Sequence, residues 1–283
     1  RVDRRQRQMC IRDRPDTLHE ALNKLKPTDR YIKVLGGGQS LGPMLNLRLA
    51  QPDVLVPVAH LPELKQHRIE PHALVLGAGI THAQIEDQRV PDVTRGFLPF
   101  VAANIAYRAV RNRGTIGGSL AHADPAADWV NTLMLLDATL LISTANRASL
   151  REVTAEKFMI APFTTDLGPD EILTAIRIPI LSETARWGYH KYCRKTGEFA
   201  EALAGALIDP ARGIYRLLIG ATEGVPLLLT NAQNLLTQPN PDQLLQWLKT
   251  THLAQDAYAL KMHHTAACRA ISMLIDQSTP PTP

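Results

Sequence analysis

Two glycine-rich segments constrain this 283-residue chain more than any other feature. The first, 35–40, reads LGGGQS and ends the apolar run YIKVL, and the second, 114–119, reads GTIGGS. Glycine admits positive φ and carries no Cβ, so consecutive backbone N–H groups can converge on an anion. Ser40, Thr115 and Ser119 add hydroxyl donors. Together the two segments predict a dinucleotide whose diphosphate is held from two sides.

The two segments exclude the best-known nucleotide loops. Neither has the Lys-Ser/Thr pair of a P-loop. Neither reads GxGxxG with an acidic residue ~20 positions further on, so a Rossmann site is not indicated. Each segment by itself fits a tight turn equally well, and composition leaves the identity of the dinucleotide open. A valine at Gly117 is expected to block the approach of the backbone to the phosphates and to release the cofactor.

The net charge of +4 does not indicate a nucleic-acid-binding protein, because all of it lies at one end. Residues 1–14 hold six Arg and two Asp, which leaves 25 basic and 25 acidic residues in the rest. A neutral body offers no electrostatic footprint for a phosphate backbone. Residues 1–13 show no amphipathic period, and we interpret them as a non-native or disordered tail, with a basic targeting arm as the alternative.

The sequence also argues against a membrane span, an iron–sulfur cluster and a metal site in this chain. No apolar run approaches the ~18 residues of a membrane helix. The three cysteines, Cys10, Cys193 and Cys268, are too few and too scattered for a four-thiolate cluster, and they are typical of a reducing cytoplasm. The adjacent His263 and His264 point about 100° apart on a helix, which is poor geometry for joint ligation.

Apolar periodicity predicts an α+β chain in two domains. Helices are expected at 16–25, after Thr81, over 97–112 and from 124–128 toward Leu140, with Trp129 in the core, and strands at 31–35, 54–58, 73–79 and 176–180. From about 185, strands at 187–193, 200–208 and 214–221 precede helices at 241–249 and 259–277. The predicted domains are 14–181 and 185–277, followed by a disordered tail at 278–283.

Four segments resemble the FAD-binding (medium) subunits of the molybdenum hydroxylase family, which includes xanthine dehydrogenase and CO-dehydrogenase-like enzymes. GGGQSL with LRLAQP (36–41, 47–52) and RNRGTIGGSLAHADPAAD (111–128) resemble the two signatures of its FAD-binding domain. EILTAIRIP (171–179) and KYCRKTGEFA (191–200) look like two further landmarks. The order and spacing of all four are similar to the family pattern from about residue 14 to 276.

The resemblance implies a fold and a cofactor site. The fold is the PCMH-type, vanillyl-alcohol-oxidase-like one: two subdomains with FAD between them, then a C-terminal domain with a three-stranded sheet and helices. No residue is expected to be catalytic toward the organic substrate. The implied FAD contacts are, at the diphosphate, Gly36, Gly37, Gly38, Gln39, Ser40, Thr115, Ile116, Gly117, Gly118 and Ser119; toward the ribityl chain, His122 and Asp128; and around the flavin ring, Leu173, Lys191 and Phe199.

The resemblance also implies an electron-transfer role. A large molybdopterin-binding partner would oxidise the substrate, a small partner would carry two [2Fe-2S] clusters, and this chain's FAD would pass the electrons to an external acceptor. One alternative is a stand-alone flavin enzyme similar to UDP-N-acetylenolpyruvoylglucosamine reductase. Another is a scaffold that has lost FAD, which two departures from the family pattern favour: Ser119 for Asn and YRAV at 107–110 for HPQ(I/V). A third departure, Glu198 for Asp, leaves the role of that residue open. None of them removes a glycine.

Overall fold

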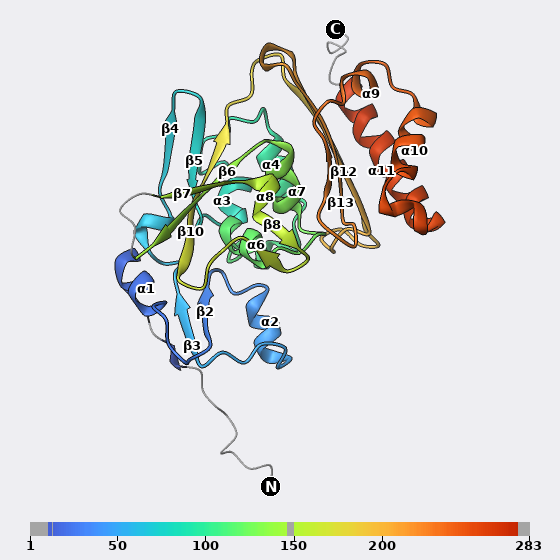
Figure 1. Ribbon diagram of the computed structural model, residues 1–283. Coiled ribbons are helices and arrows are strands. Elements are labelled where there is room, and N and C mark those ends of the chain that lie inside the picture. Colours follow the sequence, from blue (N-terminus) through green and yellow to red (C-terminus); the bar gives the residue numbers. More distant parts are fainter. Residues whose placement is uncertain (1–10, 13, 146–149, 277–283) are drawn as a thin grey trace.

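The computed structural model describes residues 11–12, 14–145 and 150–276 (Figure 1). These residues form three larger sheets and a two-stranded hairpin, with helices packed on the sheets, which confirms the predicted α+β class. The predicted tail at 278–283 and residues 1–10 lie outside the described residues. Within those ranges, no helix combines the length and the apolar character that crossing a bilayer requires.

The first sheet is small and parallel. Its strand order is β1 (Ile11–Arg12), β3 (Val54–Pro57), β2 (Ile32–Leu35). Helix α1 (Leu18–Lys24) packs on it, and the Thr17 hydroxyl caps this helix by accepting a hydrogen bond from Glu20 N–H at 3.1 Å. Because Ile11 pairs with Val54, setting aside the whole of 1–13 as a tail was wrong: the sheet includes residues 11 and 12.

The second sheet is five-stranded, and every neighbouring pair is antiparallel. Its strand order is β4 (His67–Glu70), β5 (Ala73–Gly77), β10 (Glu171–Pro179), β6 (Thr139–Thr144), β7 (Arg151–Thr154). Helix α2 (Leu41–Asn46) follows β2 beside the first sheet (Figure 1). The helices around the second sheet are α3 (His82–Glu86), α4 (Phe97–Ala103), α5 (Arg108–Arg111), α6 (Ile116–His122), α7 (Asp128–Leu135) and α8 (Ala155–Phe158), with a small hairpin of β8 (Met159–Ala161) and β9 (Thr164–Thr165).

Two helix predictions in this region were partly wrong. The expected helix over 97–112 is two helices, because the chain turns at 104–107, where Ala106 has a φ of +43°. The helix expected from 124 begins only at Asp128, since the Asp124 side chain accepts from Ala126 N–H and holds a turn there. Leu140 lies in β6 rather than on that helix.

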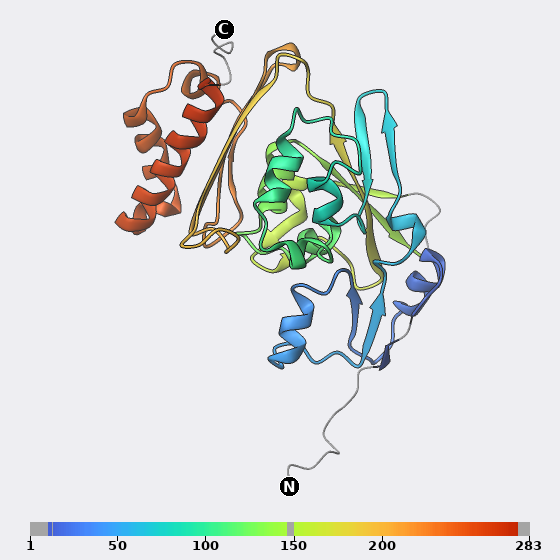
Figure 2. The ribbon, with the colours of Figure 1, turned by 180° about the vertical axis from the view of Figure 1, so that it is seen from behind.

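The third sheet belongs to the C-terminal domain and has four strands, not the predicted three. Its order is β11 (Arg186–Tyr192), β12 (Ala202–Asp209), β13 (Ile214–Gly220), β14 (Leu227–Leu229). Strand β14 is three leucines long, too short for an alternating pattern to reveal. One face carries α9 (Gln233–Thr237), α10 (Pro241–Lys249) and α11 (Ala257–Asp276), and the other face packs toward α7 (Figure 2). Strand β12 is consequently buried along its whole length.

Candidate functional site

The two glycine segments lie directly against one another. The first segment follows β2, and the second begins α6, just above it in Figure 1. A Cβ on Gly37 would lie 1.8 Å from the carbonyl oxygen of Arg113, and a Cβ on Gly36 would lie 3.1 Å from Thr115 Oγ1. Glycine is therefore required at 37 by the contact between the segments. The structure brings together the two motifs that the sequence predicted to act jointly.

The first segment keeps its backbone donors available. Within the described residues, none of the N–H groups of 37–40 donates to a protein acceptor, although the Gly38 and Ser40 carbonyls accept from Gly42 and Met44 N–H. Gly38 has a φ of +73°, which lets the chain turn tightly here. A row of half-buried, unused N–H groups is the arrangement that binds an anionic oxygen. The segment fits a phosphate group.

The second segment is the first turn of α6, not the free turn that the sequence suggested. Thr115 caps the helix by accepting from Gly118 N–H at 3.1 Å. Ile116 N–H donates to Ile80 O at 3.0 Å, and Gly117 N–H donates to Ala78 O at 2.9 Å. These N–H groups are already hydrogen-bonded within the protein and are not free to bind a ligand. The second segment thus forms a rigid surface beside the first segment and its free donors.

Gly117 is required by packing. A Cβ on Gly117 would lie 2.4 Å from the Cβ of Ala78, which follows β5. A valine at 117 would first push α6 away from this strand. We therefore expect valine at 117 to act through this clash with Ala78, not by blocking the approach to the phosphates.

Asp128 and Lys191 meet as a buried ion pair. Lys191 Nζ lies 2.9 Å from Asp128 Oδ2, and the Tyr189 hydroxyl donates to Asp128 Oδ1 at 2.8 Å. Burial raises the pKa of the Asp128 carboxyl, and the Lys191 ammonium opposes that rise. Burial also raises the pKa of Tyr189, so its hydroxyl stays protonated and donates. Since both Asp128 oxygens are engaged within the protein, Lys191 is the member of this group with a further N–H to offer a ligand.

The other three candidate contacts lie on separate elements. His122 ends α6 and packs beside Phe163 with ring centroids 5.3 Å apart, and partial burial lowers its pKa. Leu173 is in β10 with its side chain in the core, just before a register shift in the pairing with β6. Phe199 lies in the turn between β11 and β12 with 61% of its surface exposed. An exposed aromatic ring in such a turn is available to cover a ligand.

Sequence reasoning missed His82. It is buried at the start of α3, and its Nδ1 accepts from Trp129 Nε1–H at 2.9 Å. Burial, with a smaller contribution from Arg111, lowers the pKa of His82 to about 4, so the ring is neutral. A Cβ on Gly114 would lie 2.7 Å from His82 Nε2, so the ring packs against the second glycine segment. Trp129 is fully buried, which confirms its predicted place in the core.

The departure at 107–110 has a structural account. Arg108 occupies the first position of α5, where the family proline would suit the helix start. Its guanidinium donates to Glu86 Oε2 at 2.7 Å and to Asp87 Oδ2 at 2.6 Å. Arg108 therefore joins α5 to α3.

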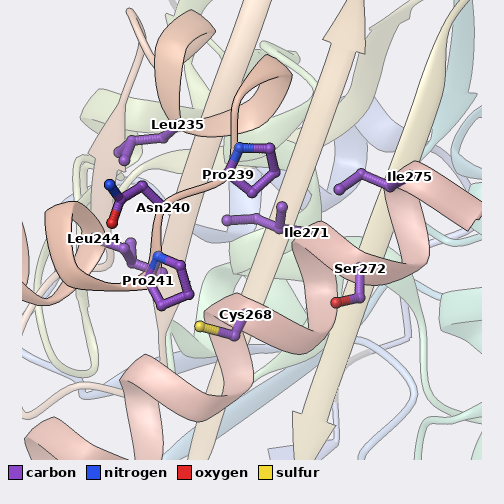
Figure 3. A pocket seen from close by; sticks show the side chains of 9 residues that line it. All are labelled: Leu235, Pro239, Asn240, Pro241, Leu244, Cys268, Ile271, Ser272 and Ile275. Atoms are coloured by element: carbon purple, nitrogen blue, oxygen red, sulfur yellow. The ribbon is translucent and has the colours of Figure 1, made fainter.

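A groove lined by side chains lies elsewhere. Figure 3 shows this groove between the α9–α10 connection and α11, with Leu235, Leu244, Cys268 and Ile271 on its walls. It belongs to the C-terminal helices and shares no residue with the glycine segments.

His263 and His264 donate to or contact backbone carbonyls, and the described part of the chain holds no cluster of three metal-ligating side chains.

Residues 11–181 match the family described as "FAD binding domain in molybdopterin dehydrogenase". The chain belongs to this family. Among curated relatives, the caffeine dehydrogenase subunit beta of Pseudomonas sp. (strain CBB1) is 32% identical over 69% of this chain and 66% of its own length. The nicotine 6-hydroxylase medium subunit of Paenarthrobacter nicotinovorans is 32% identical over 78% of each chain. The chain thus spans slightly less than two thirds of the first of these relatives.

A solved structure is similar to this chain well beyond residue 181. The chain from carbon monoxide dehydrogenase of Hydrogenophaga pseudoflava, in a form that lacks the Mo-pyranopterin moiety, superposes with a TM-score of 0.83 at 28% identity, covering 94% of this chain and 97% of that one. The family predicted from the sequence, its flavoprotein fold and FAD as its cofactor are confirmed. The match includes the C-terminal domain that residues 11–181 do not contain.

Proposed function

We propose that this flavoprotein is the FAD-carrying medium subunit of a molybdenum hydroxylase complex. It receives electrons from [2Fe-2S] clusters on a small partner, while a large molybdopterin-binding partner oxidises the substrate. The observation that carries the proposal is the row of unused N–H groups at 37–40 set against the second glycine segment. When bound, FAD supplies the redox chemistry, and the protein supplies placement and electrostatics.

Different residues of this chain would contact different parts of FAD. The N–H groups of Gly37 to Ser40 would donate to the diphosphate, with the hydroxyls of Ser40 and Ser119 nearby. The remaining N–H of Lys191 would donate at the flavin end, and Phe199 would cover the ring from the β11–β12 turn. The Asp128 carboxylate would hold Lys191 charged and in position. The free thiols of Cys193 and Cys268 support a cytoplasmic location.

The test begins with the purified chain and its cofactor. We expect a yellow protein that releases one FAD on denaturation and that co-purifies with a large and a small subunit when the neighbouring genes are expressed with it. A folded, colourless protein that takes up no FAD would contradict the proposal and favour the scaffold alternative. Rapid NAD(P)H oxidation by the chain without partners would instead favour a stand-alone flavin enzyme.

A further inference from the structure

Arg111 lies between the second glycine segment and the turn at 104–106. Its guanidinium binds Glu86 through two bonds, Nε to Oε2 at 2.8 Å and Nη2 to Oε1 at 3.0 Å. Its Nη1 donates to two successive carbonyl oxygens, Ile105 O at 2.9 Å and Ala106 O at 2.8 Å. The side chain is 12% exposed. The planar guanidinium of one arginine thus fixes a turn in which Ala106 adopts a φ of +43°.

The same turn supports two of the groups assigned to the flavin end of the site. Lys191 Nζ donates to Asn104 O at 3.4 Å, in addition to its ion pair. Gly197 has a φ of +90°, and a Cβ on it would lie 2.8 Å from Ala106 O. Gly197 precedes Phe199 by two residues in the β11–β12 turn. Arg111 therefore holds the carbonyls of Ile105 and Ala106, while Lys191 and Gly197 contact the same turn at Asn104 O and Ala106 O.

We propose that Arg111 is a positioning residue for the cofactor site. By fixing the carbonyls of 105 and 106, it holds Lys191 and the Phe199 turn in place relative to the glycine segments. This inference rests on the proposed function only for the identity of the ligand. The contact network itself is a property of the protein without FAD. Arg111 is joined to the second segment through residues 112–114, so one side chain links the two ends of the site.

The experiment compares Arg111→Gln with Arg108→Gln. Both variants remove ion pairs to Glu86, but only Arg111 bonds the carbonyls of the turn. Limited trypsin digestion reports on the Phe199 turn, because Arg194 is 81% exposed there and Lys195 follows it. In Arg111→Gln we expect cleavage at 194–195 to accelerate about tenfold, the ratio that corresponds to losing one charge-assisted hydrogen bond. Arg108→Gln should match the wild type.

A second readout uses bound FAD. We expect Arg111→Gln to release FAD about tenfold faster and to alter the visible circular dichroism of the flavin, because the guanidinium that binds the carbonyls of 105 and 106 is lost. Arg111→Lys should not restore either property, since an ammonium cannot reproduce the planar fork. Wild-type cleavage and wild-type flavin release in a folded Arg111→Gln variant would overturn the inference.

A second variant covers the case in which Arg111→Gln does not fold. Gly197→Ala leaves Arg111 intact and breaks the contact between the two turns. It should also accelerate cleavage at 194–195 and flavin release, and unchanged values there would overturn the inference. If the wild type takes up no FAD, the proposed function fails, while the trypsin comparison still decides whether Arg111 holds the turn.

Discussion

Asp128 and Lys191 join two distant parts of the chain: the carboxylate comes from α7, within the residues that match the FAD-binding family, and the ammonium comes from β11, beyond them, with 2.9 Å between Oδ2 and Nζ. Asp128 is 5% exposed and the Lys191 side chain 9%. A buried ion pair tolerates the loss of both charges better than the loss of one.

Lys191→Met should therefore destabilise the protein strongly. It leaves the Asp128 carboxylate buried without its cation, and we expect a loss of about 3–5 kcal/mol in the free energy of unfolding. The double variant Asp128→Asn/Lys191→Met should recover most of that loss. Urea denaturation of the three proteins measures both values. A double variant as unstable as Lys191→Met would show that the charge is not the cause.

The Lys191→Met variant should also respond to pH with a definite sign. Burial already raises the pKa of Asp128, and losing Lys191 removes the main influence that opposes the rise. The folded protein then binds the Asp128 proton more tightly than the unfolded chain does, so stability increases as the pH falls from 7 toward the ordinary carboxyl pKa of about 4. Relative to the double variant, which lacks this carboxyl, Lys191→Met should gain stability between pH 7 and 5.

His82 predicts the opposite dependence on pH. Its pKa is about 4 in the folded protein and 6.5 ordinarily, so the unfolded chain takes up the proton first as the pH falls. The contribution of neutral His82 is complete above pH 6.5 and is lost progressively toward pH 4, by about 2 kcal/mol at pH 5. His82→Asn keeps an acceptor for Trp129 and removes the titration. Its denaturation midpoint should change less between pH 7 and 5 than that of the wild type.

Gly37→Ala tests the contact between the glycine segments. The added methyl would fall 1.8 Å from Arg113 O, so the first segment must move and its free N–H groups lose their alignment. We expect FAD affinity to fall by more than about tenfold, equivalent to about 1.4 kcal/mol. Gly42→Ala is the matched control, because nothing lies within 4 Å of its Cβ position and alanine suits helix α2. Isothermal titration of the apoproteins with FAD compares the two; equal affinities would argue against the assignment.

Ser119→Asn restores the residue that the family usually carries. Ser119 is half-buried in α6, beside the glycine at 118, and its hydroxyl is shorter than an amide. An amide that reaches the cofactor adds one hydrogen bond, and we expect FAD to bind about fivefold tighter, which is about 1 kcal/mol. Weaker binding in Ser119→Asn would mean that the site has adapted to the smaller side chain. Ser40→Ala in the first segment is a comparison in which we expect FAD to bind more weakly.

The sequence predicted the parts of the site better than their connections. The glycine segments and the long strands follow from local chemistry, and the four motifs indicated the family. Lys191 and Asp128 stand 63 residues apart with no common period, so their pairing required the packing of two domains. His82 was missed because a histidine at a helix start has no distinctive pattern. Arg111 belonged to a recognised motif, but only coordinates show that it binds carbonyls of the turn at 104–106.

The burial of β12 on both faces limits how such subunits can be recombined. A chimera that takes residues beyond 185 from another member of the family would place a foreign sheet against α7. At Gly205 in this sheet, even an added methyl group would lie 2.7 Å from the Leu135 side chain. A suitable exchange point for engineering is therefore a surface turn, not the apparent border between the two halves of the polypeptide.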